Sequence, residues 1–381
     1  MSPTGTPRKS LASVHETEDW RREIPESGRR PVRLWLWSIA GMTLLTLIVG
    51  GITRLTQSGL SIVDWAPLMG VVPPMGEVAW QEAFDAYRAY PEYRELRQGM
   101  TLDEFRFIYF WEYIHRLVAR AIGLVFLLPF AYFAVRGHLT RSLAGRTLLL
   151  FMLGAAQGAM GWFMVTSGLV DVPRVSHYRL AAHLSLAVVI FGYAVWLARD
   201  LAVGDPGPPV SGATQRLLRN GLAFVGALLA VQIVWGAFVA GLRAGLYYNT
   251  FPLMGGGILP PDFLRLEPAL LNLVENPSAV QWMHRLLGTL LLGVAGAFYL
   301  RVRRAPDLDS HARLLNPALF GMIGAQYLLG VLTLLLVVPV WLGVTHQAMA
   351  MILVGVWLVW VHSVREAGRA AGPADLISRR G

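Results

Sequence analysis

Eight apolar stretches of about 20 residues each constrain the fold of this 381-residue chain more than any other feature. A helix of that length crosses the ~30 Å hydrocarbon core of a bilayer, where only helices or closed barrels satisfy every backbone hydrogen bond. The stretches are too long and too uniformly apolar for the alternating strands of a barrel. The sequence therefore predicts an all-α integral membrane protein with eight transmembrane helices, at residues 34–53, 107–135, 146–166, 177–198, 217–240, 279–300, 314–336 and 340–362.

The placement of arginine predicts the topology, because basic residues in short loops stay on the cytoplasmic side. Basic residues gather in both tails and in the second, fourth and sixth connections, whereas residues 54–106 hold eight acidic residues against five arginines. Both termini are therefore expected in the cytoplasm. The expected division is a cytoplasmic tail, an N-terminal four-helix unit with a long outer loop, a cytoplasmic linker, a C-terminal four-helix unit and a second tail, at residues 1–33, 34–198 (loop 54–106), 199–216, 217–362 and 363–381.

Charge and cysteine content exclude several classes of function. The net charge is +9, but the basic residues are dispersed among short loops and form no groove-like face, so no nucleic-acid partner is expected. Cysteine is absent, which excludes disulfides, thiolate-held iron–sulfur clusters and covalent c-type haem. The N-terminal tail lacks the apolar core of a secretory signal and is acidic for a mitochondrial presequence. The expected location is a bacterial inner membrane, with the lipid bilayer as a partner, rather than the mitochondrial inner membrane.

The two halves of the chain resemble each other. Residues 114–117 match residues 283–286 at an offset of 169. Gln157 and Gly161 match Gln326 and Gly330 at the same offset, and the fifth span repeats the spacing with a further glutamine and glycine, at 232 and 236. Duplicated helical units are common in membrane proteins, and their binding sites lie inside or between the repeats.

Four of the nine histidines lie well inside the predicted spans, one in each of the second, fourth, sixth and eighth: His115, His183, His284 and His346. All four spans enter from the outer side, and each histidine follows its start by about 8 to 12 Å. The four imidazoles therefore share one depth. A single intramembrane histidine is more often an interhelical hydrogen-bonding residue than a ligand, but four at matched depth favour ligands.

Haem is the cofactor that this pattern favours. Imidazole is its usual ligand, and an iron inside a helix bundle takes two imidazoles from facing helices. Cysteine is absent and Glu112 is the only acid well inside a span, so zinc and di-iron carboxylate sites would lack ligands. One bis-imidazole haem in each half fits better.

Charged residues beside the histidines leave two interpretations open. Arg116 and Arg285 directly follow two of the histidines, and arginine is well shaped to bind the carboxylates of haem propionates. Alternatively, Arg116 only neutralises Glu112, four residues earlier. Glu112 precedes His115 by three residues on the same helix face, so its carboxyl is expected to point toward the iron site. There it is either a proton-exchanging catalytic group or one half of that ion pair.

Residues 50–61 with Asp64-Trp65 and Pro73-Pro74 resemble the first outer loop of the haem A synthase family. The resemblance continues through Tyr90-Pro91-Glu92-Tyr93 and the Trp-Glu-Tyr-Ile-His-Arg motif at 111–116, and the eight spans and four histidines extend it over nearly the whole chain. Some members carry an outer-loop cysteine pair. This chain has none and resembles the branch of proteobacteria and mitochondria.

The resemblance implies that the enzyme oxidises the C8 methyl of haem O to a formyl group. Successive hydroxylations pass through a hydroxymethyl haem and supply haem A to terminal cytochrome oxidase. It also implies that His284 and His346 hold the iron of a resident haem b, and that His115 and His183 contact the iron of haem O. Glu112, His115 and His183 would be catalytic, and Arg54, Arg116 and Arg285 would bind cofactor. Implied partners are haem O synthase, an electron donor that the sequence does not identify, and further copies of the chain in a homo-oligomer.

Two other functions fit the topology and the histidines. A di-haem cytochrome b would pass electrons without modifying haem, although such proteins typically carry two histidines on each of two helices. A haem carrier or exporter would use the same histidines to hold its cargo. Pigment analysis discriminates between them, because only a synthase changes the haem.

Overall fold

The computed structural model describes residues 21, 23–63, 70–168, 175–202 and 210–371. Asp64-Trp65 and most of both predicted tails lie outside these ranges. Within them, eight helices are long and apolar enough to cross a membrane, which confirms the prediction of an all-α membrane protein. They are α1 (Glu26–Leu55), α3 (Leu102–Val135), α4 (Arg141–Gly168), α5 (His177–Asp200), α6 (Gly212–Gly241), α8 (Pro277–Arg303), α9 (Ser310–Leu335) and α10 (Val340–Ala371).

Most of the helices are longer than the apolar spans that the sequence indicates. α1 begins at Glu26 instead of residue 34, and α10 continues beyond residue 362. An apolar window measures only the hydrocarbon-length part of a helix, whereas the backbone remains helical through the polar residues on either side. Parts of the expected tails and of the linker 199–216 are therefore helical.

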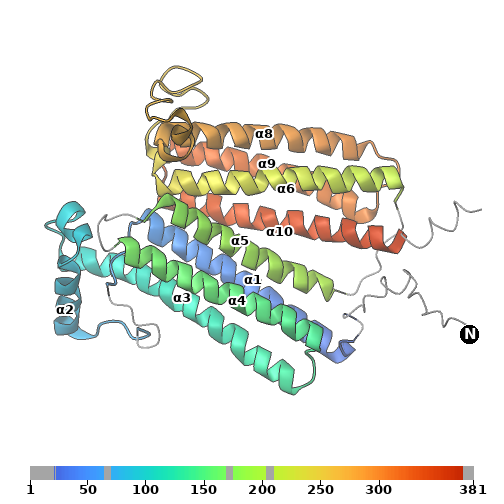
Figure 1. Ribbon diagram of the computed structural model, residues 1–381, viewed down its shortest axis with the longest axis horizontal. Coiled ribbons are helices and arrows are strands. Elements are labelled where there is room, and N and C mark those ends of the chain that lie inside the picture. Colours follow the sequence, from blue (N-terminus) through green and yellow to red (C-terminus); the bar gives the residue numbers. More distant parts are fainter. Residues whose placement is uncertain (1–20, 22, 64–69, 169–174, 203–209, 372–381) are drawn as a thin grey trace, which may run out of the picture.

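The eight helices run back and forth along one direction (Figure 1). The connections 56–101 and 242–276 lie at one end of the bundle, where α5 and α10 also begin. The start of α1 and the end of α10 lie at the opposite end. Among the described residues, the loops predicted to lie on the same side of the membrane are therefore at the same end of the molecule.

Two apolar cores divide the bundle. The first gathers side chains of α1, α3, α4 and α5, among them Trp35, Phe126 and Phe191. The second gathers side chains of α6, α8, α9 and α10, among them Leu222, Phe298 and Trp360. We call these groups the N-terminal half and the C-terminal half. They appear as two groups in Figure 1, and α5 packs against α6 as α1 packs against α10.

Glycines allow the closest helix contacts, as is common where lipid removes the hydrophobic drive for association. A Cβ atom added to Gly226 of α6 would overlap the ring of Trp357 on α10. That indole cannot move aside freely, because its Nε1 donates a hydrogen bond of 2.9 Å to the carbonyl of Leu222.

Gly226→Ala should therefore destabilise the protein by about 1–3 kcal/mol through overpacking. Gly123→Ala on α3 is the matched control, because no atom lies within 4 Å of its added Cβ. Thermal unfolding of the detergent-solubilised protein measures both. Equal melting temperatures for the two variants would contradict the packing argument.

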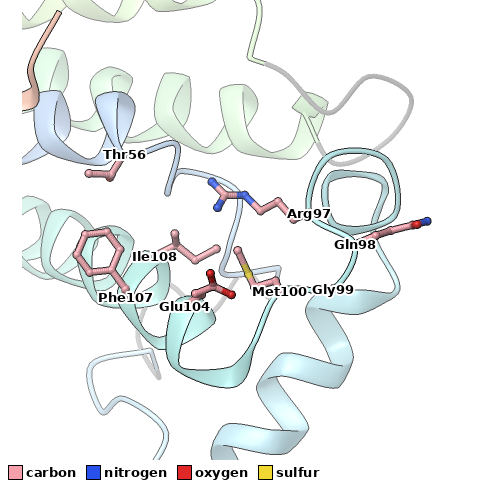
Figure 2. A pocket seen from close by; sticks show the side chains of 8 residues that line it. All are labelled: Thr56, Arg97, Gln98, Gly99, Met100, Glu104, Phe107 and Ile108. Carbon is pink, nitrogen blue, oxygen red and sulfur yellow. The ribbon is translucent and has the colours of Figure 1, made fainter.

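The described part of the predicted outer loop 54–106 folds into a small cap instead of an irregular connection. It contains α2 (Gly76–Arg88) and a π-helical turn (Glu92–Leu96), and α2 projects from the end of the bundle (Figure 1). Phe84 and Tyr87 of α2 pack on Phe105 and Ile108 of α3 in a third core. A pocket separates the cap from α1 and α3, lined by Thr56, Arg97, Gln98, Gly99, Met100, Glu104, Phe107 and Ile108 (Figure 2).

Glu92 is a buried carboxyl in this cap, with 6% of its surface exposed. Burial raises the pKa of Glu92 to about 7, aided by the nearby Glu112 and opposed by Arg97, whose Nε lies 3.5 Å from Oε1, and by the Tyr87 hydroxyl. The folded cap thus binds this proton more tightly than the unfolded loop does. The stability that protonated Glu92 gives the cap is present below about pH 4.5 and is lost as the pH rises to about 7.

Glu92→Gln should remove the pH dependence of the cap's stability, because an amide remains uncharged at every pH. Limited proteolysis of the cap, compared at about pH 5 and about pH 8, measures the difference. The unmodified cap should become more susceptible at the higher pH, and the Gln variant should not. Equal pH dependence in the two proteins would show that Glu92 does not control the cap.

The connection 242–276 is also folded. It carries two short 3-10 turns (Ala244–Leu246 and Ala269–Leu271) and α7 (Asn272–Glu275). The buried side chain of Asn272 accepts hydrogen bonds from the backbone N–H groups of Arg265 and Leu266 and donates to the Leu266 carbonyl. The starts of α3 and α8, which lie at the same end of the bundle, are therefore both covered by folded segments.

Candidate functional site

The C-terminal half brings two of the predicted histidines together. His284 of α8 and His346 of α10 face each other with ring centroids 6.5 Å apart and planes at 77°. A metal ion held between two imidazole nitrogens, about 2.0 Å from each, separates the ring centroids by about 6 Å. Both residues are half-buried. The pair therefore has a spacing at which two imidazoles would reach one metal ion.

The N-terminal half carries the equivalent histidines, His115 of α3 and His183 of α5. Both are half-buried, and His183 lies near enough to affect His115 electrostatically. Nδ1 of His115, His183 and His284 is enclosed without a hydrogen-bond partner among the described residues. Buried imidazole nitrogens without partners are costly in a membrane unless a ligand uses the ring.

Each imidazole faces a glycine on a neighbouring helix, which leaves room for the ring. An added Cβ atom would lie 2.8 to 3.4 Å from the Cε1 atom of the histidine in the pairs Gly50–His115, Gly161–His183, Gly236–His284 and Gly330–His346. The glycines come from α1, α4, α6 and α9, and the histidines from α3, α5, α8 and α10. The internal repeat in the sequence therefore corresponds to a repeated contact in the fold.

Three glutamines also contact the histidines, and they are not among the site residues predicted from the sequence. Gln157, Gln232 and Gln326 stand four residues before three of these glycines. Their side-chain amides donate to the backbone carbonyls of His183, His284 and His346, at 3.1, 3.1 and 2.9 Å. The recurring Gln-x-x-x-Gly spacing was the signal that could have identified them.

Glu112 is 2% exposed, and four hydrogen bonds hold its carboxylate. Oε2 accepts from the backbone N–H groups of Ser61 and Ile62 at 2.7 and 2.9 Å and from the Ser61 hydroxyl at 2.7 Å. Oε1 accepts from Arg116 at 2.6 Å. The ion pair expected from the sequence is present. The carboxylate's contacts are with this turn and with Arg116, and none of them is with the ring of His115.

Gln281 is the counterpart of Glu112 in the C-terminal half, at the repeat offset of 169. Its amide donates to the carbonyl of Ala244 at 2.9 Å and to that of Tyr248 at 3.3 Å, and its oxygen accepts from Arg285 at 3.2 Å. Glu112 therefore joins α3 to the turn that follows α1, and Gln281 joins α8 to the turn that follows α6. Only the N-terminal half uses a carboxylate for this.

The three predicted cofactor-binding arginines all lie at the end of the bundle that carries the cap. Arg116 donates to the carbonyl of Ile62, and Arg285 donates to those of Tyr248 and Thr250, each at 2.8 Å. Arg54 crosses between the halves, where it donates to the last carbonyls of α6, at Ala240 and Gly241. A cation there is stabilised by the negative end of the helix dipole.

The donor set excludes most metal sites at the histidines. Among the described residues, one group of three potential ligands lies close together, Asp200, His362 and Glu366, and it is at the opposite end of the bundle. Arg21 donates to both of its carboxylates, so this group is a charge cluster. Each half thus offers two imidazoles as potential ligands. That set fits an iron that brings its own four equatorial nitrogens, as haem does.

Comparisons with known proteins agree with this chemistry. The family described as "Cytochrome oxidase assembly protein" matches residues 33–358. A protein named Heme A synthase from Nitrosospira multiformis is 45% identical over 339 residues, covering 88% of this chain and 94% of the relative. Proteins of the same name from Rhodospirillum centenum and Parvibaculum lavamentivorans are each 44% identical, over 96% and 89% of this chain and 92% and 96% of their own lengths. With its two histidine pairs, the chain belongs to the haem A synthase family.

Proposed function

We propose that this chain converts haem O to haem A by oxidising the C8 methyl of the porphyrin to a formyl group, through a hydroxymethyl haem. The observation that carries the proposal is the facing pair His284 and His346, 6.5 Å apart, in a chain of this family. The enzyme is an oxidoreductase acting on a CH or CH2 group. A methyl group without activation needs a redox cofactor, because side chains supply neither electrons nor oxidant.

The two halves have different roles in this proposal. His284 and His346 hold a resident haem b, and His115 and His183 hold the iron of haem O. When bound, the haem groups supply the electron transfer and oxygen chemistry. The histidines would hold each iron, and the helices keep the site within the membrane, where the substrate's long apolar tail also partitions. Arg116, Arg285 and Arg54 would bind the haem carboxylates at the outer end, in exchange for part of their present contacts with backbone carbonyls.

Glu112 is the group we assign to proton exchange. Hydroxylation and loss of water from the diol both move protons. A buried carboxyl on the helix that carries His115 can take these protons up and release them. Its counterpart Gln281 joins helix and turn differently, by donating from its amide nitrogen to the carbonyls of Ala244 and Tyr248. The turn at Ser61 and Ile62 instead presents N–H groups that donate to the Glu112 carboxylate. The oxygen of a glutamine at 112 would accept from the same N–H groups, which supports Gln as the test substitution.

The proposed location is a bacterial inner membrane, with both termini in the cytoplasm. The end of the bundle opposite the cap carries Arg136, Arg141, Arg301, Arg303 and Arg304, consistent with retention of basic loops inside. We further propose that haem O synthase delivers the substrate, that a separate electron donor reduces the resident haem, and that copies of the chain associate in a homo-oligomer.

Pigment extracted from membranes that contain this chain and a source of haem O should include haem A. A di-haem cytochrome b or a haem carrier would leave haem O unchanged. His115→Ala and His183→Ala should lose haem A yet retain the low-spin spectrum of the resident haem, and His284→Ala should lose that spectrum. Haem A formation at the normal rate without His115 and His183 would contradict the assignment of the N-terminal pair.

Glu112→Gln should leave the protein in the membrane with its haem b spectrum and lower haem A formation by about 10²–10⁴-fold, the usual effect of losing a general acid or base. Haem O or its alcohol should accumulate. Asp103→Asn is the matched control, because that carboxylate starts the same helix but is 89% exposed. Normal haem A formation in the Gln variant would remove Glu112 from the chemistry. Loss of the variant from the membrane would favour an anchoring role alone.

A further inference from the structure

The three glutamines occupy equivalent positions in the repeated sites. In addition to its hydrogen bond to the histidine backbone, each amide nitrogen lies close to the ring itself. The distances from Nε2 of Gln157 and Gln232 to Nε2 of the histidine are 3.3 and 3.4 Å, and Nε2 of Gln326 lies 3.2 Å from Nδ1 of His346. One side chain thus contacts both the backbone and the imidazole of the same residue.

The fourth equivalent position holds a threonine. Thr46 stands four residues before Gly50 on α1, as Gln232 stands four residues before Gly236 on α6, and both pairs are offset by 186. The backbone carbonyl of Thr46 faces the ring of His115 as that of Gln232 faces the ring of His284. The Thr46 hydroxyl, however, donates to the carbonyl of Met42 at 2.8 Å. It is therefore directed back to its own helix.

The glutamines also carry an unused acceptor. Oε1 of Gln157, Gln232 and Gln326 is enclosed without a hydrogen-bond partner in the described part of the chain, and so is Nδ1 of His183 and of His284. An imidazole that binds a metal through one nitrogen usually donates the N–H of the other to a carbonyl or carboxylate, which fixes the orientation of the ring. The glutamine amide lies against each of these rings through its nitrogen, and its unpartnered oxygen belongs to the same amide group.

We propose that Gln157, Gln232 and Gln326 are positioning residues that fix the imidazoles of His183, His284 and His346, and that Thr46 leaves His115 as the exchangeable ligand. The C-terminal half then holds haem through two fixed ligands and retains it. The N-terminal half holds haem through one fixed and one exchangeable ligand, as a site that takes up substrate and releases product requires. This inference rests on the proposed role of the four histidines as haem ligands, and does not depend on the reaction.

Release of haem from the purified full-length protein tests the proposal without measuring activity. The protein in detergent is loaded with haem b at both sites and mixed with excess apomyoglobin, which captures released haem. Release should be biphasic, with a fast phase from the N-terminal half and a slow phase from the C-terminal half. Gln232→Thr should accelerate the slow phase by about 10–100-fold, the usual cost of losing such a partner of a metal ligand. Thr46→Gln should slow the fast phase.

Gln215→Thr is the matched control. Gln215 lies on the same helix as Gln232, and its amide also donates to a carbonyl of another helix, Val364, at 2.7 Å, but far from the histidines. This variant should leave both phases unchanged. If Gln232→Thr does not accumulate in the membrane, Gln326→Thr tests the same contact at His346.

An unchanged slow phase in the Gln232 and Gln326 variants would overturn the inference, as would equal acceleration by Gln215→Thr. If the unmodified protein binds no haem, the proposed function fails and this inference fails with it. If haem binds at both sites but release does not respond to these substitutions, only this inference fails.

Discussion

The cost of placing polar side chains in lipid is the constraint on which the rest of this structure depends. An imidazole within the hydrocarbon must find its partners inside the protein. Here each of the four histidines lies against a glycine that makes room for the ring, and three also contact a glutamine. His284 and His346 face each other at a spacing that suits one iron. Folding and the proposed haem binding thus depend on the same few contacts.

The two halves share one framework because the sequence is duplicated. The proposed division of roles rests on the positions at which the two halves differ. At one pair of equivalent positions the N-terminal half has Glu112 where the C-terminal half has Gln281. At another it has Thr46 where the C-terminal half has Gln232. The ionisable side chain, Glu112, and the histidine without a glutamine partner, His115, therefore lie in the same half. This is consistent with chemistry in the N-terminal half and retention of a cofactor in the C-terminal half.

Much of the fold follows from the sequence, because long apolar runs can form only a few structures in a bilayer. The eight spans and the one-per-helix histidines follow from hydropathy and spacing alone. The cap could not be predicted, since the burial of Glu92 depends on α2 folding back onto α3. The contact of Arg54 with α6 joins residues 186 positions apart, and no local pattern indicates it. The glutamines recur at a fixed spacing, but their partners became apparent only with the helices in place.

The number of haem sites tests the central claim most directly. Titration of the haem-free protein with haem b, followed by its Soret absorbance, should saturate at two equivalents per chain. It should saturate at one equivalent in a variant with both His284 and His346 replaced by alanine, and at one in the matching variant of His115 and His183. Saturation at two equivalents in either double variant would show that these histidines are not the ligands and would contradict the account.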